Sequence, residues 1–422
     1  MKFIVNGGKK LKGEIDVRGS KNAALPVLAA TLLTQRTCTI DNIPVIKDVL
    51  TFIEIIQSMG GDVRWLSERK VRITNKNIDP NKISRDLVRN IRASILLIGP
   101  LLARFGEVKI SLPGGCHIGP RPMDIHLDAF KELGFSVTYN KNGEYYHIKR
   151  TKNIHKKEIT LKGLTVTGTE NMLMYAAIHP LKINIAALEP HVEDLGKLLV
   201  KLGAKIKGFN SHTLEVIKPI QKAGSAVEHT VMYDPIEAGT FIILGGATKS
   251  DIKVKNVPVE SLTLTFKKLE EFGVILKIKG TSVFVKGSRS KLKAVSKLIT
   301  KEYPGIPTDL QAPFGVLATQ AKGETLIFDT IYEGRLKYLY ELDKMGASVN
   351  ILSAHKAIIK GPQSLVGKNV ESIDLRAGAT LIIAALVAKG ESVLHGAEQI
   401  DRGYEKIEER LTKLGADIKR EE

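Results

Sequence analysis

Met345-Gly346-Ala347-Ser348-Val349 and Leu414-Gly415-Ala416-Asp417-Ile418 are two copies of the short signature that decides the fold. In the signature a glycine follows an apolar residue, and two residues, small or polar in most copies, then lead into another apolar residue. Six copies occur, and their first glycines lie at positions 60, 134, 203, 273, 346 and 415. Successive glycines are therefore 69 to 74 residues apart. So regular a spacing indicates a sixfold internal repeat.

Each of these glycines stands where a helix is expected to end and a strand to begin. Glycine adopts the left-handed backbone conformation of a helix C-cap more readily than any other residue. Apolar residues spaced three and four apart upstream of the glycines predict amphipathic helices, for example over residues 48–59, 124–133 and 404–414.

A second and more apolar helix is predicted earlier in each repeat. The six segments are 22–33, 93–103, 171–177, 238–247, 311–319 and 377–388. Short β-like runs at 38–40, 108–110 and 392–394 separate the two helices. The repeating unit is therefore strand, helix, strand, helix, strand.

Helices that are apolar nearly all round must lie inside, with sheets and amphipathic helices covering them. The sequence thus predicts an α/β fold of two domains, each of three β-α-β-α-β units around a helical core. We expect one domain over 20–230 and the other over 1–19 plus 231–422. Two strands at 2–6 and 14–18 are left over, and we expect them to complete the last unit.

Composition narrows the class of protein. The chain has 422 residues, 43% of them hydrophobic, and only two cysteines, too few for a disulfide framework. Residues 1–7 lack the long apolar core that follows a basic region in a secretory signal, so we expect no such signal there. The longest apolar stretches, such as 379–388, are too short to span a bilayer. We therefore expect a cytoplasmic protein with no membrane partner.

The formal net charge of +18 suits either nucleic acid or small polyanionic substrates. Aromatic residues make up only 5% of the chain, and no motif that reads RNA or DNA occurs. We expect small-molecule substrates and no nucleic acid.

Charged or hydrogen-bonding residues stand at the start of all six apolar helices. They are Ser20-Lys21-Asn22, Asn90-Ile91-Arg92, Thr167-Gly168-Thr169, Ile236-Glu237, Thr308-Asp309 and Asp374-Leu375-Arg376. Helix N-termini favour anions, so a basic side chain there opposes the helix dipole and indicates an anion nearby. The alternative is that Ser20, Thr167 and Thr308 are N-caps and that the other residues are solvated surface. For Glu237 alone we prefer this alternative.

Residues 112–124 form a predicted loop, with three glycines and three prolines in thirteen residues. Such a loop is long enough to act as a lid. It places Cys116 beside His117 and near Arg121, and such surroundings lower the pKa of a thiol. Cys38 lies in an apolar run, so we expect it to have a structural role. No second cysteine lies near Cys116, and His117 and His126 have no ligand-like spacing, so we expect no metal.

Several motifs together resemble the UDP-N-acetylglucosamine 1-carboxyvinyltransferases, relatives of enolpyruvyl-shikimate phosphate synthase. The resemblance spans essentially the whole chain, and it implies two inside-out α/β domains of three repeats each, with the active site in the inter-domain cleft. It is carried by residues 20–26 (SKNAALP), 113–122 (PGGCHIGPRP), 307–311 (PTDLQ), 374–377 (DLRA) and 400–405 (IDRGYE).

The resemblance implies an addition–elimination reaction that starts peptidoglycan synthesis without a cofactor. The sugar 3-hydroxyl adds to C2 of phosphoenolpyruvate while C3 is protonated, and phosphate then leaves. By this resemblance the catalytic residues are Cys116 as general acid or aid to phosphate departure, Asp309 as base, Lys21 and Arg402. Lys21, Arg121 and Arg402 hold the phosphoenolpyruvate. It further implies that Cys116 is the target of fosfomycin, and we expect a monomer.

The substrate-binding residues that the resemblance implies come from both expected domains. They are Lys21, Asn22, Arg92, Arg121, Pro122, Met123, Asp124, Ile125, Thr165, Val166, Thr167, Asp309, Ile331, Asp374, Arg376 and Arg402.

The chain departs from the family pattern at four places. Pro235 stands where an arginine is usual, Ile306 replaces a common Phe, Pro313 replaces a common Gln, and residues 332–336 read YEGRL instead of FENRF. Two alternatives therefore stay open. One is enolpyruvyl-shikimate phosphate synthase, which lacks the cysteine-bearing loop. The other is a catalytically retired paralog that binds polyanions. Pro235 and the positive net charge support this alternative.

Overall fold

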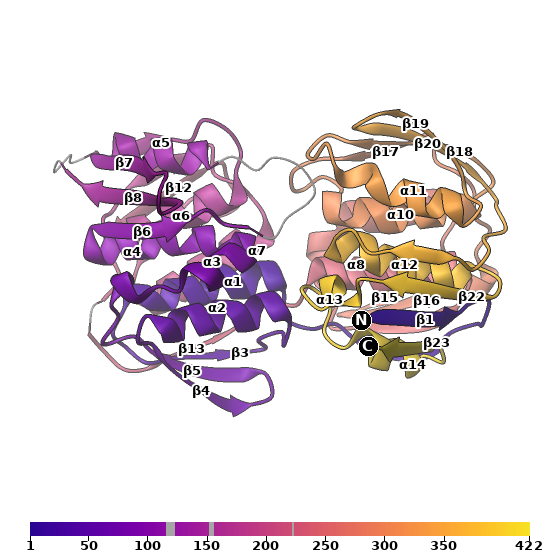
Figure 1. The fold of residues 1–422 in the computed structure, drawn as a ribbon, viewed down its shortest axis with the longest axis horizontal. Helices are drawn as coiled ribbons and strands as arrows, with labels where there is room; N and C mark the ends of the chain where they lie inside the picture. The colour runs from indigo at the N-terminus through magenta and orange to yellow at the C-terminus, as the bar shows by residue number, and fades with distance from the viewer. Residues whose placement is uncertain (115–122, 152–155, 222) are drawn as a thin grey trace. The chain divides into compact units, whose positions relative to one another are not determined.

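The computed structural model describes all residues except 115–122, 152–155 and 222. It divides into two compact units (Figure 1). The N-terminal unit comprises residues 19–114 and 123–232, and the C-terminal unit comprises Met1–Arg18 with Tyr233–Glu422. Each unit has a hydrophobic core of its own.

The N-terminal unit holds three sheets and seven α-helices among its described residues. The sheets have the strand orders β13-β3-β5-β4, β6-β8-β7 and β11-β12-β10-β9. The strands are β3 (Cys38–Asp41), β4 (Asp62–Ser67), β5 (Lys70–Thr74), β6 (Glu107–Ser111), β7 (Phe135–Asn140), β8 (Tyr145–Arg150), β9 (Glu158–Thr160), β10 (Lys182–Asn184), β11 (Lys205–Lys207), β12 (Thr213–Lys218) and β13 (Val227–Thr230). The helices are α1 (Lys21–Ala30), α2 (Lys47–Ser58), α3 (Arg85–Asn90), α4 (Ile98–Phe105), α5 (Asp124–Glu132), α6 (Val166–Ala176) and α7 (Pro190–Lys201).

The C-terminal unit repeats this plan with three four-stranded sheets. Their strand orders are β15-β16-β14-β2, β17-β18-β20-β19 and β21-β22-β1-β23. The strands are β1 (Lys2–Asn6), β2 (Lys12–Asp16), β14 (Asp251–Lys255), β15 (Leu276–Lys279), β16 (Ser282–Lys286), β17 (Lys297–Thr300), β18 (Gly323–Asp329), β19 (Ser348–Ser353), β20 (Lys356–Gly361), β21 (Asn369–Glu371), β22 (Glu391–His395) and β23 (Asp417–Glu421). The helices are α8 (Pro235–Ala247), α9 (Thr263–Glu271), α10 (Thr308–Gln320), α11 (Tyr338–Lys344), α12 (Leu375–Val387), α13 (Ala397–Ile400) and α14 (Ile407–Thr412).

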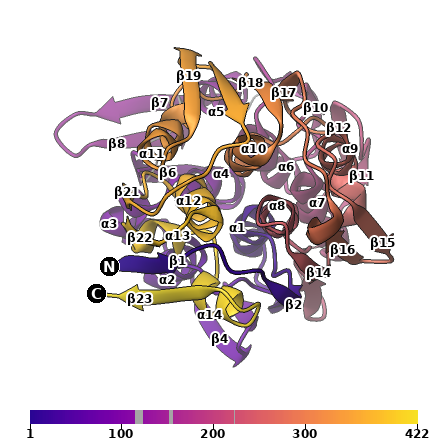
Figure 2. The ribbon, with the colours of Figure 1, turned by 90° about the vertical axis from the view of Figure 1, so that its right-hand side faces the viewer.

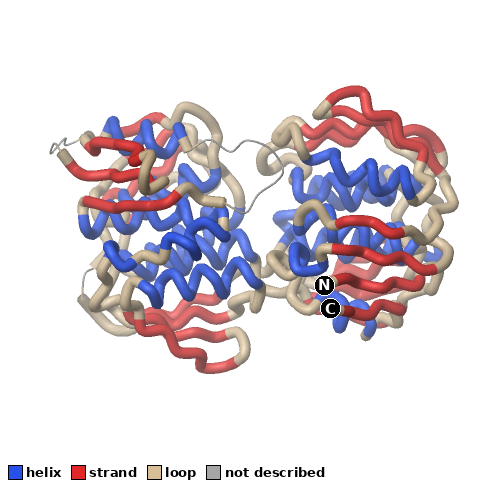
Figure 3. Tube along the Cα trace, viewed as in Figure 1, coloured by secondary structure: helices blue, strands red, loops and turns tan. Residues whose placement is uncertain are grey.

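The apolar helices lie inside and the sheets lie outside in each unit (Figure 3). In α8 every residue from Ile236 to Ala247 is buried, and α10 and α12 are buried along almost their whole length. A helix without a polar face cannot border water, so the sheets and the amphipathic helices must enclose it. The α/β fold class with its inside-out units is confirmed.

The six repeat glycines end the amphipathic helices in the way the sequence predicts. All six have positive φ, from 81° at Gly273 to 106° at Gly203. At the end of α7 the N–H of Gly203 donates to the carbonyl of Val200 at 2.8 Å, and the N–H of Ala204 donates to that of Leu199 at 3.0 Å. This pair of bonds satisfies carbonyls that would otherwise be left open at the helix end.

Some element boundaries differ from the expectation. The segment 93–103 is a 3₁₀-helix (Arg92–Leu97) followed by α4, and α14 begins only at Ile407, after Lys406 with φ 41°. The segment 171–177 belongs to a helix that already begins at Val166.

The expectation that both leading strands complete the last repeat is wrong for the second strand. Strand β1 does pair with β22 and β23 of the last sheet. Strand β2 instead runs parallel to β14 and joins the sheet of the fourth repeat. Alternation of apolar residues shows which face of a strand is buried but not which partner strand it meets.

Among the described residues, no helix is both long and apolar enough to cross a membrane.

Gly415→Ala tests the role of the repeat glycines. Gly415 has φ 90°, and no heavy atom lies within 4 Å of the position a Cβ would take, so the substitution adds backbone strain and no clash. We expect the free energy of unfolding to fall by about 1 kcal/mol, because left-handed backbone costs an L-residue that much. Urea unfolding followed by circular dichroism measures it.

Gly415→Asn is the matched control, because asparagine tolerates the left-handed region better than alanine. We expect it to lose less stability than Gly415→Ala. An alanine variant as stable as the wild type would show that this glycine is not required for its conformation.

Candidate active site

Several polar residues of the C-terminal unit lie at the N-termini of its core helices. Asp234 caps α8 by accepting the N–H groups of Ile236 and Glu237, at 2.7 and 3.1 Å. Asp374 caps α12 in the same way. Side-chain caps of this kind satisfy donors that the helix itself leaves open.

The interpretation of Thr167 and Thr308 as N-caps is wrong. The cap of α6 is Thr165, whose hydroxyl accepts the N–H of Gly168 at 3.2 Å. Thr308 is the first residue of α10, after Pro307. Ser20 does occupy the cap position of α1, but its side chain makes no capping hydrogen bond.

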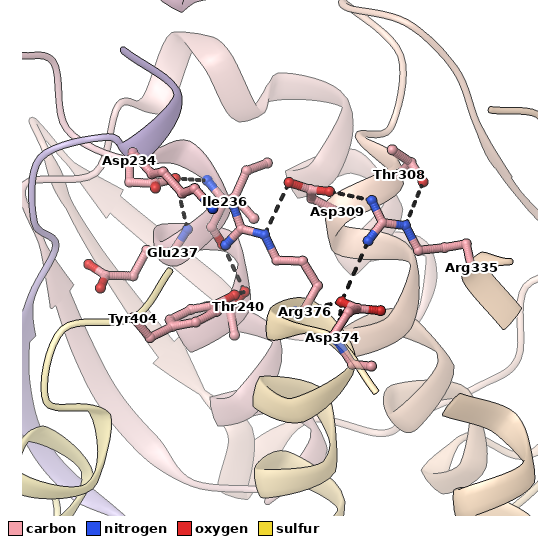
Figure 4. Close-up of polar contacts among 12 residues, drawn as sticks. Asp234, Ile236, Glu237, Thr240, Thr308, Asp309, Arg335, Asp374, Arg376 and Tyr404 are labelled. Atoms are coloured by element: carbon pink, nitrogen blue, oxygen red, sulfur yellow. Dashed lines mark hydrogen bonds and ion pairs between the residues drawn. The ribbon is translucent and has the colours of Figure 1, made fainter. Parts of the chain in front are cut away.

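Asp309, in the first turn of α10, lies between two arginines (Figure 4). Nη2 of Arg335 donates to one carboxylate oxygen at 2.6 Å, and Nε of Arg376 donates to the other at 3.0 Å. Both arginines are buried, with 5% and 4% of their surface exposed. A buried guanidinium needs a carboxylate partner, and here one carboxylate serves two of them.

The contacts continue on the far side of Arg335. Its Nε donates to the hydroxyl of Thr308 at 3.2 Å, and Thr308 donates to Asp329 at 2.6 Å. The other oxygen of Asp329 accepts the backbone N–H of Ile331 at 3.0 Å. The position of the Ile331 backbone is therefore tied to that of Asp309 through a chain of hydrogen bonds.

Arg376 is held from several sides. Its guanidinium lies over the ring of Tyr404, 5.3 Å from the ring centre. Burial alone would lower the pKa of Arg376, but Asp309, Tyr404 and Asp234 together raise it above its ordinary value. Among the described residues its buried Nη1 has no hydrogen-bond partner, which leaves a charged donor able to bind an acceptor from a ligand.

Glu237 has a structural role, and it is not solvated surface. It is 3% exposed. Its two oxygens pair with Nη1 and Nη2 of Arg410, at 2.5 and 3.1 Å, and one of them also accepts the N–H of Arg18 at 2.7 Å. The carboxylate thus joins α8, α14 and the segment that follows β2.

Arg402 lies in the turn between α13 and α14 and is partly buried. Its Nη1 donates to the side-chain oxygen of Gln399 at 3.4 Å.

In the N-terminal unit Lys21 opens α1, with Asn22 next to it. The Lys21 ammonium lies 2.7 Å from the carboxylate of Asp48 in α2, and both side chains are largely buried. The protein itself therefore supplies an anion beside this basic residue at a helix start.

His126, on α5, positions Thr167. Its Nδ1 accepts from the side-chain amide of Asn171 at 3.1 Å, so its Nε2 carries the hydrogen and donates to the Thr167 hydroxyl at 3.2 Å. The same amide also donates to the Ile95 carbonyl, and its oxygen accepts the N–H of Gly99. Burial, with help from the charge of Arg92, lowers the pKa of His126 to about 3. His126 is therefore neutral near pH 7.

The remaining expected residues of this unit lie at two helix starts. Met123 is buried and precedes α5, which Asp124 and Ile125 begin. Val166 begins α6 between Thr165 and Thr167.

Cys116, Arg121 and Pro122 lie outside the described residues. The other cysteine, Cys38, is fully buried in β3, and burial raises the pKa of its thiol to about 11. That fits the structural role expected for Cys38. The described residues contain no group of three or more His, Cys, Asp or Glu side chains that could hold a metal ion.

Sequence reasoning missed several partners of the expected site residues. Asp48, Asp329 and His126 carry no motif signal, because each acts through a neighbour distant in the sequence. Arg335 stands in a stretch compared with the family pattern, but nothing in that comparison places it against Asp309.

Sequence comparison identifies the family. The profile of EPSP synthase (3-phosphoshikimate 1-carboxyvinyltransferase) matches residues 5–411. A protein named UDP-N-acetylglucosamine 1-carboxyvinyltransferase from Koribacter versatilis is 42% identical, over 99% of this chain and 96% of its own length. A protein of the same name from Helicobacter pylori is 39% identical, over 100% of this chain and 99% of its own.

Solved structures show the same fold at lower identity. The enolpyruvyl transferase NikO from Streptomyces tendae is 22% identical and superposes with a TM-score of 0.89, over 99% of this chain and 98% of its own. An EPSP synthase from Acinetobacter baumannii is 17% identical with a TM-score of 0.75, over 99% of each chain.

The fold and the matched profile define an enolpyruvyl transferase of the EPSP synthase type. Within this class, the chain belongs to the family of UDP-N-acetylglucosamine 1-carboxyvinyltransferases.

Burial of neutral His126 makes stability depend on pH. The unfolded chain binds a proton at this residue below about pH 6.5, whereas the folded protein binds it only near pH 3. The unfolded state therefore holds more protons between these values, and the free energy of unfolding falls as the pH drops through this window. We expect His126 to account for a loss of up to about 2 kcal/mol between pH 6.5 and 5.

Urea unfolding of wild type and His126→Gln at several pH values measures this loss. Glutamine does not titrate, so the variant should lose less stability than the wild type over the same range. Parallel pH profiles for the two proteins would contradict a neutral, buried His126.

Proposed function

We propose that this chain transfers the enolpyruvyl group of phosphoenolpyruvate to the 3-hydroxyl of UDP-N-acetylglucosamine and releases phosphate. The hydroxyl oxygen adds to C2 and a proton adds to C3, which gives a tetrahedral ketal. Loss of the C3 proton and of phosphate then restores the double bond. The product enters peptidoglycan synthesis at its first committed step.

One observation carries this proposal. Relatives named for this activity share 39–42% identity with the chain along nearly its whole length. The solved EPSP synthases from Acinetobacter baumannii share only 17–18%. The sequence is thus much nearer to enzymes that use the sugar nucleotide than to those that use a shikimate phosphate.

Asp309 acts in this proposal as the base for the sugar hydroxyl. The support is its fixed position, because a hydrogen bond from a separate buried arginine reaches each of its oxygens. A carboxylate has about four lone-pair sites, more than these two arginine hydrogen bonds use. A base held in one orientation transfers protons more effectively than one that must be ordered on binding.

Cationic groups neutralise the substrates, which together bring several negative charges. Lys21, Arg121 and Arg402 bind phosphoenolpyruvate in this proposal, and Cys116 supplies the proton or assists phosphate departure. Arg376 supports the same picture, since its buried Nη1 has no acceptor among the described residues. Donors placed before the reaction begins stabilise developing charge without reorganisation.

The sugar nucleotide occupies a second group of residues. In this proposal they are Asn22, Arg92, the segment Arg121 to Ile125, Thr165 to Thr167, Ile331 and Asp374. The support for Thr167 and Ile331 is that part-buried hydrogen bonds hold them in place: His126 donates to the Thr167 hydroxyl, and Asp329 accepts the N–H of Ile331. We further propose that the enzyme works as a cytoplasmic monomer without a cofactor.

The retired-paralog alternative depends mainly on Pro235. Pro235 is the first residue of α8, directly after the capping Asp234. Proline suits this helix position, because its missing N–H would be unpaired there anyway. Replacement of the usual arginine is thus compatible with an intact helix start, which favours an active enzyme.

Phosphate release tests the activity. We expect release from phosphoenolpyruvate only when UDP-N-acetylglucosamine is present, and none with shikimate 3-phosphate. We expect Asp309→Asn to lower kcat about 10²- to 10⁴-fold, the usual cost of losing a general base. Asp343→Asn, an exposed residue of α11, makes the same charge change and should keep wild-type activity.

Circular dichroism must show that Asp309→Asn is folded, because the substitution leaves two buried arginines without their shared carboxylate. Release with shikimate 3-phosphate and none with the sugar nucleotide would overturn the proposal. So would a folded Asp309→Asn variant of full activity.

Fosfomycin distinguishes the two cysteines. Its epoxide should alkylate Cys116, whereas Cys38 should not react, because its thiol is buried and its pKa is raised to about 11. Mass spectrometry should find one adduct, on the Cys116 peptide.

Cys116→Asp should keep measurable activity with a lower pH optimum and resist the inhibitor, since a carboxyl group donates a proton without opening the epoxide in the same way. An adduct on Cys38, or equally fast irreversible inhibition of Cys116→Asp, would contradict the assignment.

A further inference from the structure

A basic pocket of about 790 Å³ lies in the C-terminal unit, outside the proposed catalytic residues. The residues that line it come from β2, β14 and β16 and from the segments before β2 and after α8 and β16. The three strands neighbour one another in one sheet (Figure 2). The 13-residue helix α8 has Asp234 at its other end, so the pocket is about 20 Å along the helix from that residue.

The strand register lines up the side chains of the pocket. Lys12, Asp251 and Lys286 are direct partners across β2, β14 and β16. The neighbouring row, which points to the opposite face, contains the buried Ile252 and Val285. Because successive residues of a strand alternate in direction, the Lys12 row must face solvent.

The pocket carries a large excess of positive charge. Five lysines and one aspartate line it. Asp251 lies 3.6 Å from Lys286 and accepts hydrogen bonds from Ser288, and Lys253 pairs with Glu14 at 3.2 Å. Within the described part of the chain, Lys10, Lys12 and Lys249 have no carboxylate partner.

Two of these lysines are held close to each other. Nζ of Lys10 donates to the Thr248 carbonyl at the end of α8, at 2.9 Å. Lys249 is the residue after Thr248. Partial burial, together with the charge of Lys249, lowers the pKa of Lys10. The like charges repel each other, and a bound anion would relieve this repulsion.

The backbone at Lys249 is unusual for a lysine. Its φ is 51°, and the N–H groups of Lys249 and Ser250 close the helix end as they do at the repeat glycines. Here the left-handed position holds lysine in place of glycine. A side chain kept at a strained backbone position is consistent with a function for that side chain.

The sheet beneath the pocket is backed by the apolar core of the unit. Leu11 and Ile252 are 2% and 3% exposed. The hydroxyl of the buried Ser250 accepts the N–H of Leu11 at 2.9 Å and a hydrogen bond from Thr248 at 2.8 Å. Phe284 presents its ring at one side, with Nζ of Lys253 5.7 Å from the ring centre.

We propose that this pocket binds a small molecule that carries two adjacent phosphate groups and a planar ring, the chemistry of a nucleoside diphosphate. Lysine ammonium groups are compact charges that bind phosphate oxygens. An aromatic face beside them offers a stacking surface for the ring. A single phosphate carries at most about two negative charges, so it would leave part of the excess charge unbalanced.

Isothermal titration calorimetry of the full chain with ADP, pyrophosphate and adenosine tests the proposal. We expect ADP to bind most tightly, pyrophosphate more weakly, and adenosine not to bind measurably. Phe284→Ala should reduce the advantage of ADP over pyrophosphate. Affinity should fall as salt rises, because the attraction is electrostatic.

A triple variant, Lys10→Ser with Lys12→Ser and Lys249→Gly, should lower ADP affinity about ten-fold or more. The matched control, Lys293→Ser with Lys297→Ser and Lys301→Ser, removes three exposed lysines elsewhere in the same unit and should bind ADP like the wild type. Glycine accommodates the backbone of Lys249, so the melting temperature of the pocket variant should not fall on that account.

No ADP binding by the wild type at millimolar concentration would overturn the proposal. Equal ADP affinity in the wild type and the pocket variant would also overturn it, because the nucleotide would then bind elsewhere on the chain. An equal loss in the control variant would show that overall charge, and not this pocket, attracts the ligand.

Discussion

A helix that is buried on every side must still satisfy the N–H groups of its first turn, and this constraint determines where the chain keeps its polar residues. Water does not reach such a helix, so side chains at the start of the helix must accept the N–H groups of its first turn. Asp234 caps α8, Asp374 caps α12 and Thr165 caps α6. The inside-out arrangement therefore concentrates hydrogen-bonding side chains at the helix N-termini. A few basic side chains added there are enough to make a site for anionic substrates.

Basic side chains at the helix starts oppose the helix dipole, so nearby carboxylates must balance their charge. Arg376 lies in the first turn of α12, where a positive charge is locally unfavourable. Asp309, in the first turn of α10, offsets both this arginine and Arg335. Removal of one member of such a buried set leaves an uncompensated charge, which costs far more than a surface ion pair contributes. The same contacts that stabilise the helix starts therefore fix the orientation of the residue proposed as base.

The N-terminal unit solves the same problem with different chemistry. Lys21 is balanced by Asp48 from the next helix. Around Thr167 the partners are neutral, because His126 is too deeply buried to take up a proton near pH 7. An uncharged network holds one geometry without the desolvation cost of a charge. The two units thus share a repeat but differ in how they position polar side chains.

The sequence by itself determined the sixfold repeat, the inside-out fold and the left-handed glycines such as Gly203, because these follow from periodicity and local backbone preference. The family resemblance named Asp309 and Arg376, but not that one carboxylate joins Arg376 to Arg335. Only the tertiary structure decided that β2 pairs with β14, that Asp48 faces Lys21 and that His126 holds Thr167. Each of these contacts joins residues far apart in the sequence. Local patterns carry no information about such partners, because the partners meet only when the helices and sheets pack.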